Sequence, residues 1–144
     1  MAVSELIKAL RIDFRDRLDG VQIYSLQKGH GTNQIREIRE LFAMDELGGR
    51  VDSEHGAFMD SAAIMTQLDL VISPDTAIVH LAGALGVPTW LLLPTVPHWP
   101  WMMDRDDSPW YASMRLFRQK NAGQWDEVFD QMVIALKQQL AAWR

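Results

Sequence analysis

The residues best suited to chemistry lie where a predicted buried strand gives way to a helix, in the sequence S-P-D-T-A-I-V-H. Asp75 and Thr76 open this helix, and the free backbone N–H groups at a helix start attract anions. The Thr76 hydroxyl adds a donor, and the small Ala77 lets a phosphate approach. His80 follows Thr76 by one turn, so the two share a face. A phosphate site is predicted; the alternative is that Asp75 only caps the helix and His80 only packs.

A second polar segment follows the first predicted strand, in the sequence Q-K-G-H-G-T-N at residues 27–33. Lys28 can neutralise a diphosphate as a point charge, and Gln27 offers both a donor and an acceptor. Gly29 and Gly31 complete neither the dinucleotide-binding fingerprint nor a P-loop. No acidic residue closes the unit of the first strand at the position where a dinucleotide-binding domain has one, which disfavours a nicotinamide dinucleotide as ligand. A solvated turn is the alternative interpretation of this segment.

A third segment, the loop predicted at 95–112, is dense in Trp and Pro. Flat aromatic faces beside charged groups suit sugar or base recognition, and we predict Trp99, Arg105 and Asp107 as donor or sugar contacts. A loop of this length without structure of its own is usually functional. The alternative is that the Trp side chains form a core private to the loop. Arg105 among three Asp residues predicts a salt-bridged turn rather than a metal site.

Strands and helices alternate along the chain, which predicts an α/β protein with a Rossmann-like parallel sheet covered by helices on both faces. The three polar segments all fall at the carboxyl ends of strands, where such sheets bind ligands. Asp60 and Ser61 are predicted to cap one helix, and the glycines at 48–49 to end another. The predicted strands are 21–26, 70–73, 87–94 and 114–118, and the predicted helices are 4–17, 34–47, 60–68, 75–85 and 125–143, with 50–59 a short strand or a loop.

The chain has 144 residues, with 14 Lys and Arg against 19 Asp and Glu, a formal net charge of −5. This length predicts a single domain, residues 1–144. The negative charge argues against a nucleic-acid partner. The chain has no cysteine, which excludes a disulfide scaffold, a thiolate zinc site and a cysteine nucleophile. No apolar stretch is long enough to span a membrane and the N-terminus lacks the apolar region of a secretory signal, so we expect a cytoplasmic protein.

Three stretches together resemble the C-terminal, donor-binding half of GT-B glycosyltransferases. They are S-L-Q-K-G at 25–29, D-L-V-I-S-P-D-T-A-I-V-H-L-A-G-A-L-G-V-P at 69–88, and the Trp-rich segment 92–119. The resemblance is above all to the glycosyltransferase-like domain that follows tetratricopeptide repeats in many bacterial proteins. That domain is related to the heptosyltransferases of glycosyltransferase family 9. The resemblance covers nearly the whole chain from about residue 20.

The resemblance implies a Rossmann-like domain that binds a nucleoside-diphosphate-sugar without a metal ion. The family motif D-[ST]-x-x-x-H-[LA]-A falls on Asp75, Thr76, Ala77 and His80 and holds the donor diphosphate at a helix start. The family's basic residue after the first strand falls on Lys28. One departure is Ala77, where heptosyltransferases often have glycine; alanine is compatible if the backbone stays helical there.

The resemblance also implies a missing half, because a GT-B enzyme binds its acceptor and holds its usual general base on an N-terminal domain. Residues 1–20 are then a leading helix, a remnant of the connection between the halves. We expect donor binding but no transfer activity from the chain alone, with hexosyl or heptosyl transfer once an acceptor half is supplied by a partner chain. The alternative is a stand-alone, non-enzymatic nucleotide-binding or protein-interaction module. The face exposed by the missing half predicts a homodimer.

Overall fold

The computed structural model describes residues 21–29, 32–33, 35, 44–54 and 56–143. These residues belong to two compact units, one formed by Met1–Glu54 with Phe129–Arg144 and the other by His55–Val128, and each unit is described by itself. The helix predicted at 4–17 lies outside the described residues. The final helix α5 (Asp126–Trp143) matches the helix predicted at 125–143; its first three residues belong to the second unit and the remainder to the first.

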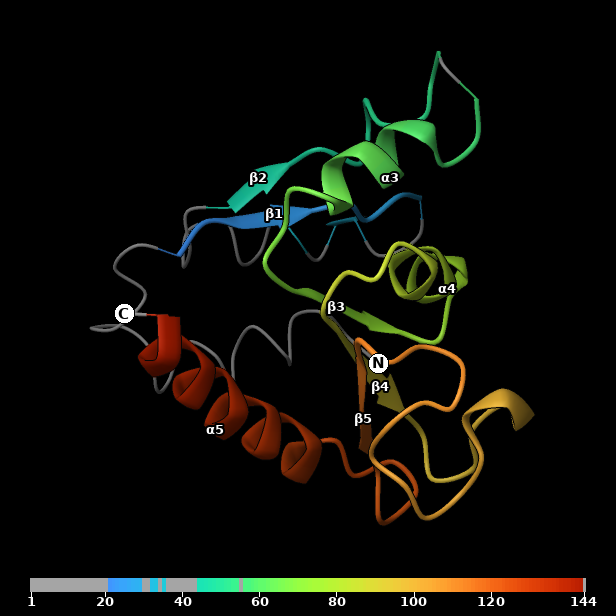
Figure 1. Cartoon of the computed structure of the whole chain (residues 1–144), viewed down its shortest axis with the longest axis vertical. Helices are drawn as coiled ribbons and strands as arrows, with labels where there is room; N and C mark the ends of the chain where they lie inside the picture. Colours follow the sequence, from blue (N-terminus) through green and yellow to red (C-terminus); the bar gives the residue numbers. More distant parts are fainter. Residues whose placement is uncertain (1–20, 30–31, 34, 36–43, 55, 144) are drawn as a thin grey trace. The chain divides into compact units, whose positions relative to one another are not determined.

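The first unit contains a two-stranded parallel sheet. Strand β1 (Ile23–Ser25) pairs with β2 (Met44–Glu46), so that Ser25 lies opposite Glu46 at the carboxyl ends of both strands (Figure 1). Strand β1 confirms the prediction at 21–26. The helix predicted at 34–47 is wrong at its end, because residues 44–46 satisfy their backbone groups in a ladder with β1. Most of that predicted helix, residues 36–43, lies outside the described residues.

A tight turn after β2 explains the glycines that were expected to end a helix. The amides of Leu47 and Gly48 donate to the carbonyl of Ser25 at 2.9 and 3.2 Å. A Cβ at Gly48 would lie 2.0 Å from the carbonyl oxygen of Gln27, a distance that no side chain tolerates. Glycine is therefore required at this position by the close approach of the two backbones.

The second unit is built on a three-stranded parallel sheet in the order β3-β4-β5. Strand β4 (Thr89–Leu93) lies between β3 (Val71–Pro74) and β5 (Met114–Arg118), and every residue of β4 is buried (Figure 1). Helix α4 (Ala77–Ala84) connects β3 to β4, and α3 (Met59–Met65) precedes β3. Parallel strands with helical connections confirm the predicted α/β class and are consistent with a Rossmann-like fold.

The ends of these helices were predicted less well than their centres. Helix α3 begins after Phe58, which has a positive φ of 68° and makes no capping hydrogen bond through its side chain. Asp60 and Ser61 lie inside the first turn, so the prediction that they cap the helix is wrong. Helix α4 ends at Ala84 with Leu85 as its C-cap residue, and Gly86 follows with φ +72°. Gly86 thus lies directly after the helix predicted at 75–85, and glycine adopts this conformation without a Cβ clash.

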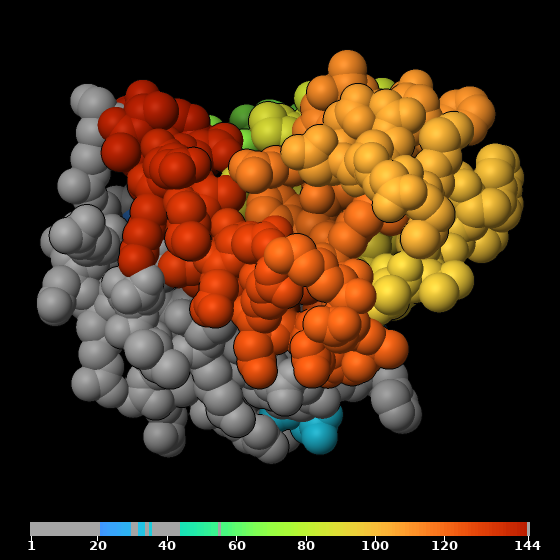
Figure 2. All heavy atoms as spheres, turned by 90° about the horizontal axis from the view of Figure 1, so that it is seen from below, coloured from blue at the N-terminus to red at the C-terminus, as the bar shows by residue number. Residues whose placement is uncertain are grey.

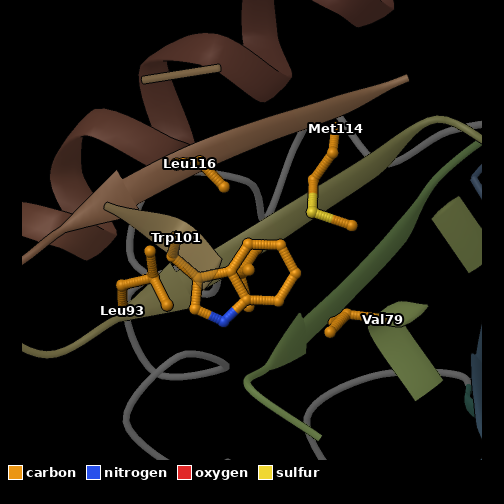
Figure 3. Close-up of a cluster of buried hydrophobic side chains, with 6 residues drawn as sticks. Val79, Leu93, Trp101, Met114 and Leu116 are labelled. Atoms are coloured by element: carbon orange, nitrogen blue, oxygen red, sulfur yellow. The ribbon is translucent and has the colours of Figure 1, made fainter. Parts of the chain in front are cut away.

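The core of the second unit includes Trp101 from the loop after β4. Its indole is fully buried between α4 and the sheet, close to Val79, Leu93 and Met114 (Figure 3). Trp101 lies in a short 3-10 helix, η1 (Trp99–Trp101). The expectation of a loop without structure is therefore wrong for this segment. The alternative, a core private to the loop, is wrong for Trp101, because its indole belongs to the core shared with α4 and the sheet.

Tyr111 packs on α4 at a position where only glycine fits. A Cβ at Gly83 would lie 2.5–2.9 Å from atoms of the Tyr111 ring. Tyr111 is half-buried against the core cluster that contains Trp101. The missing side chain at Gly83 thus lets the loop before β5 lie directly on the helix.

Replacement of Gly83 by alanine tests this packing. We expect Gly83→Ala to destabilise the second unit by about 1–3 kcal/mol, because the added methyl group overpacks against the ring. In a Tyr111→Ala background the same change should stabilise by up to about 1 kcal/mol, since alanine forms helix better than glycine. Urea titrations of the four proteins, followed by Trp fluorescence, measure both effects. An equal loss in the two backgrounds would contradict the proposed contact.

Candidate functional site

The start of α4 combines exposed donors with a strand end, as the sequence predicted. Thr76 is the N-cap residue, with extended backbone angles of φ −143° and ψ 171°, and among the described residues no side-chain hydrogen bond caps the helix. Thr76 and Ala77 are exposed. The Thr76 hydroxyl lies 3.4 Å from the hydroxyl of Ser73. The first amides of α4 therefore have no capping carboxylate from Asp75, and they can donate to an anion.

His80 is held by the loop after β4. Its Nδ1 lies 3.1 Å from the hydroxyl of Tyr111, and its ring stacks on Trp101 with 5.1 Å between the centroids. The alternative interpretation of His80 as a packing residue thus describes its contacts in this structure. Because His80 lies one turn after Thr76, these contacts also fix the first turns of α4 against the loop.

A hollow of about 510 Å³ lies at the carboxyl ends of β1 and β2 in the first unit. The Nζ of Lys28 donates to the carbonyl of Val51 and lies 3.2 Å from the Asp52 carboxylate. The side chain of Lys28 is 44% exposed whereas that of Asp52 is 7% exposed. The Lys28 side chain therefore lines the hollow, and the buried Asp52 carboxylate balances its charge. The hollow is lined by Ser25, Gln27, Lys28, Gly29, Thr32, Ile35, Glu46, Gly48, Gly49, Val51, Asp52 and Ser53.

Two acidic residues that line this hollow, Glu46 and Asp52, were not predicted as site residues. Glu46 ends β2, where Rossmann-like folds often carry an acidic residue for a ribose hydroxyl. The prediction that no acidic residue closes the unit of the first strand is wrong, because Glu46 ends the strand paired with β1, in a range predicted as helix. Asp52 lies in the segment left as strand or loop, and it has a positive φ of 54°. No local pattern reports the strand that ends at Glu46, since M-D-E forms a strand through its pairing with β1.

Arg105 and Asp107 bind each other. The Nε and Nη2 of Arg105 each donate to an Asp107 carboxylate oxygen at 2.7 Å, which confirms the predicted salt-bridged turn. This hydrogen bonding lowers the pKa of Asp107 and raises that of Arg105. The pair persists above the lowered pKa of Asp107 and is lost as the pH falls through it. Because Arg105 and Asp107 bind each other, a sugar could contact either side chain only by replacing one of these hydrogen bonds.

Arg118 at the end of β5 fixes the middle of the loop. Its Nε donates to the carbonyl of Arg105 at 2.8 Å, and its Nη2 donates to the carbonyl of Trp101. Between these carbonyls, Met102 and Asp104 have positive φ values of 52° and 56°. Such conformations cost of order 1–3 kcal/mol each and persist only where neighbours hold them. Partial burial lowers the pKa of Arg118, which nevertheless stays charged at neutral pH.

The structure brings part of the predicted site together. Asp75, Thr76, Ala77 and His80 gather at the start of α4, in the unit that also carries Trp99, Arg105 and Asp107. Gln27 and Lys28 lie together in the hollow of the other unit. In the described part of the chain, no group of three or more His, Asp or Glu side chains could hold a metal ion. Nor is any described helix both long and apolar enough to cross a membrane.

Comparison with known proteins gives one relative. The chain is 31% identical over 123 residues to Protein FlbA of Caulobacter vibrioides, a match that covers 82% of this chain and 20% of FlbA. The chain therefore spans about one fifth of the length of this relative. No family model matches the chain, and no solved structure matches it.

The role of Arg118 can be tested by replacing its planar guanidinium group with the ammonium group of lysine. We expect Arg118→Lys to destabilise the loop by about 1–3 kcal/mol, because one ammonium cannot serve both carbonyls in the same geometry. Hydrogen exchange of the amides at 101–106 should become faster. The exposed Arg115 on the same strand supplies the control, and Arg115→Lys should leave exchange of this segment unchanged. Equal exchange in wild type and Arg118→Lys would refute the anchoring role.

Proposed function

We propose that this chain binds a nucleoside diphosphate, in the form of a nucleotide sugar, as the donor-binding part of a glycosyltransferase. The observation that carries the proposal is the start of α4: exposed, without a side-chain cap, and directly after the carboxyl end of β3. Helix amides and the helix dipole favour a phosphate at this position. The reason to propose a nucleotide sugar as the ligand is the resemblance to GT-B donor domains, which lies in segments 25–29, 69–88 and 92–119.

In this role the residues stabilise charge and do not transfer protons. Thr76 and the amides at Ala77 bind a phosphate of the donor and stabilise its negative charge. Lys28 belongs to the other unit and offers a cation to a phosphate within its own hollow. His80 positions α4 through Tyr111 and Trp101. The exposed Lys28 ammonium can contact a ligand while it remains paired with the more buried Asp52. Gln27 lines the same hollow and offers hydrogen bonds to the donor.

Transfer itself needs an acceptor site and a base, which we assign to another chain or to a longer protein. The relative FlbA is about five times as long as the matched region, which is compatible with further parts beside a domain of this kind. We therefore expect the purified chain to bind the donor without transferring sugar. We propose that the protein functions in a reducing compartment such as the cytoplasm, and its lack of cysteine agrees with this location.

A second candidate is a non-enzymatic module that binds a nucleotide or another protein. It is favoured by exposed apolar side chains in the loop after β4, among them Val96 at 81% and Trp99 at 72% exposure. Such side chains on a soluble domain mark interaction surfaces when they are contiguous. A homodimer is one outcome of this kind.

Thermal unfolding with uridine, guanosine and adenosine diphosphates and their sugars tests donor binding. A ligand at 100 times its dissociation constant should stabilise by about 2.7 kcal/mol, roughly 5–10 °C for a domain of this size. Lys28→Met should weaken binding by about tenfold or more, since it keeps the side-chain stem and removes the charge. Thr76→Val should also weaken binding, whereas Thr76→Ser, which keeps the hydroxyl, should bind as wild type does.

The matched control for charge is Lys120→Ala. Lys120 pairs with Glu127 on the surface, and such exposed pairs contribute little to stability. This variant should retain the ligand-induced shift. No shift with any of these nucleotides would reject donor binding and leave the interaction module as the better candidate.

A further inference from the structure

Five large apolar side chains stand exposed on the loop between β4 and β5, and we name them the apolar platform. Their exposed fractions range from 44% for Met102 to 81% for Val96. In Figure 2 the gold to orange atoms of this segment lie on the surface of the molecule. Side chains of this size are usually buried, so their collection on one loop calls for a partner. The members are Val96, Trp99, Met102, Met103 and Trp110.

The backbone beneath the platform is held in place. The indole nitrogen of Trp110 donates to the carbonyl of Pro100 at 2.9 Å, which ties the later part of the loop to the 3-10 helix η1. Arg118 binds the carbonyls of Trp101 and Arg105 on either side of the turn that carries the two Met residues. A fixed backbone beneath outward side chains reduces the entropy lost when a partner docks.

The chemistry of the platform suits a polypeptide better than a sugar. Met and Val offer no strong hydrogen-bonding group, and Met side chains adapt to varied apolar partners. The charged pair beside them, Arg105 and Asp107, is joined by two hydrogen bonds of 2.7 Å. A sugar needs directional hydrogen bonds beside its aromatic contact. The apolar side chains of a polypeptide need only an exposed apolar surface for binding, and the platform provides one.

The acidic residues beside the apolar platform, Asp104, Asp106 and Asp107, favour a basic polypeptide as its partner. Segment 96–110 carries three Asp and one Arg, a net charge of −2, and Arg118, which binds two carbonyls of this segment, brings the local charge to −1. Asp104 and Asp106 are exposed, while Asp107 is matched by Arg105. A basic partner would be attracted to these acidic residues. A second copy docked about a two-fold axis would place like charges against each other, because such an interface joins the same patch twice.

We propose that the apolar platform docks a polypeptide segment in which apolar side chains are flanked by Lys or Arg, such as one face of a basic amphipathic helix. The proposal does not depend on nucleotide binding, since it uses only the outer surface of the loop.

Binding of two labelled synthetic helices to the full chain tests this proposal by fluorescence anisotropy. One peptide carries Leu on one face and Lys on the other, and the second has the same Leu pattern with Glu. We expect the Lys peptide to bind and the Glu peptide not to bind. Trp99→Ala should weaken binding by about tenfold or more, as for an interface hot spot. Trp99 is 72% exposed, so its loss should leave the fold intact, which circular dichroism can verify.

Matched controls separate this surface from general attraction to an acidic chain. Ile134 on α5 has the same 56% exposure as Met103, so Ile134→Ala should have no effect where Met103→Ala weakens binding. Asp104→Asn with Asp106→Asn should weaken binding, whereas Asp130→Asn on α5 should not. Equal losses at the control sites would overturn the proposal. So would a dimer in light scattering that Trp99→Ala dissociates, or quenching of Trp fluorescence by oligosaccharides that the same variant abolishes.

Discussion

Burial of Trp101 is the interaction on which the second unit depends. Its indole completes the core between α4 and the sheet, its carbonyl accepts from Arg118, and its ring stacks on His80. Removal of a buried Trp side chain costs about 3–5 kcal/mol, a large share of the stability of a small unit. One side chain therefore supports both the start of α4 and the exposed loop.

This shared support explains how an exposed helix start stays ordered without a side-chain cap. Helix α4 is fixed from its other side, where His80 contacts Tyr111 and Gly83 admits the Tyr111 ring. Donors held rigid before a ligand arrives need no reorganisation when negative charge develops on it. Packing around Tyr111 thus serves the proposed phosphate site, although this side chain has no chemical role in it.

The sequence allowed the sheet of the second unit to be predicted because its strands carry their own signal. Strand β4 is buried along its whole length and apolar after Thr89, and β5 was predicted with its observed bounds. Strand β2 carries no such signal, since M-D-E becomes a strand only through its pairing with β1. Phe58 could not be predicted at the start of α3, because a bulky residue with positive φ reflects tertiary constraint and not local preference.

The same distinction separates the site residues. The placement of Asp75, Thr76 and His80 at a strand end and in the first turns of a helix was predictable, because these are local properties. The partners of Lys28 and Arg118 lie 13 to 24 residues away in sequence, and no local pattern reports them. Residue type alone also misleads: Arg105 and Asp107 resemble ligand contacts, yet they bind each other. Once such internal pairs are identified, the exposed Thr76 hydroxyl with the α4 amides and the apolar surface around Trp99 remain, and they suit different ligands, a phosphate and an apolar side chain.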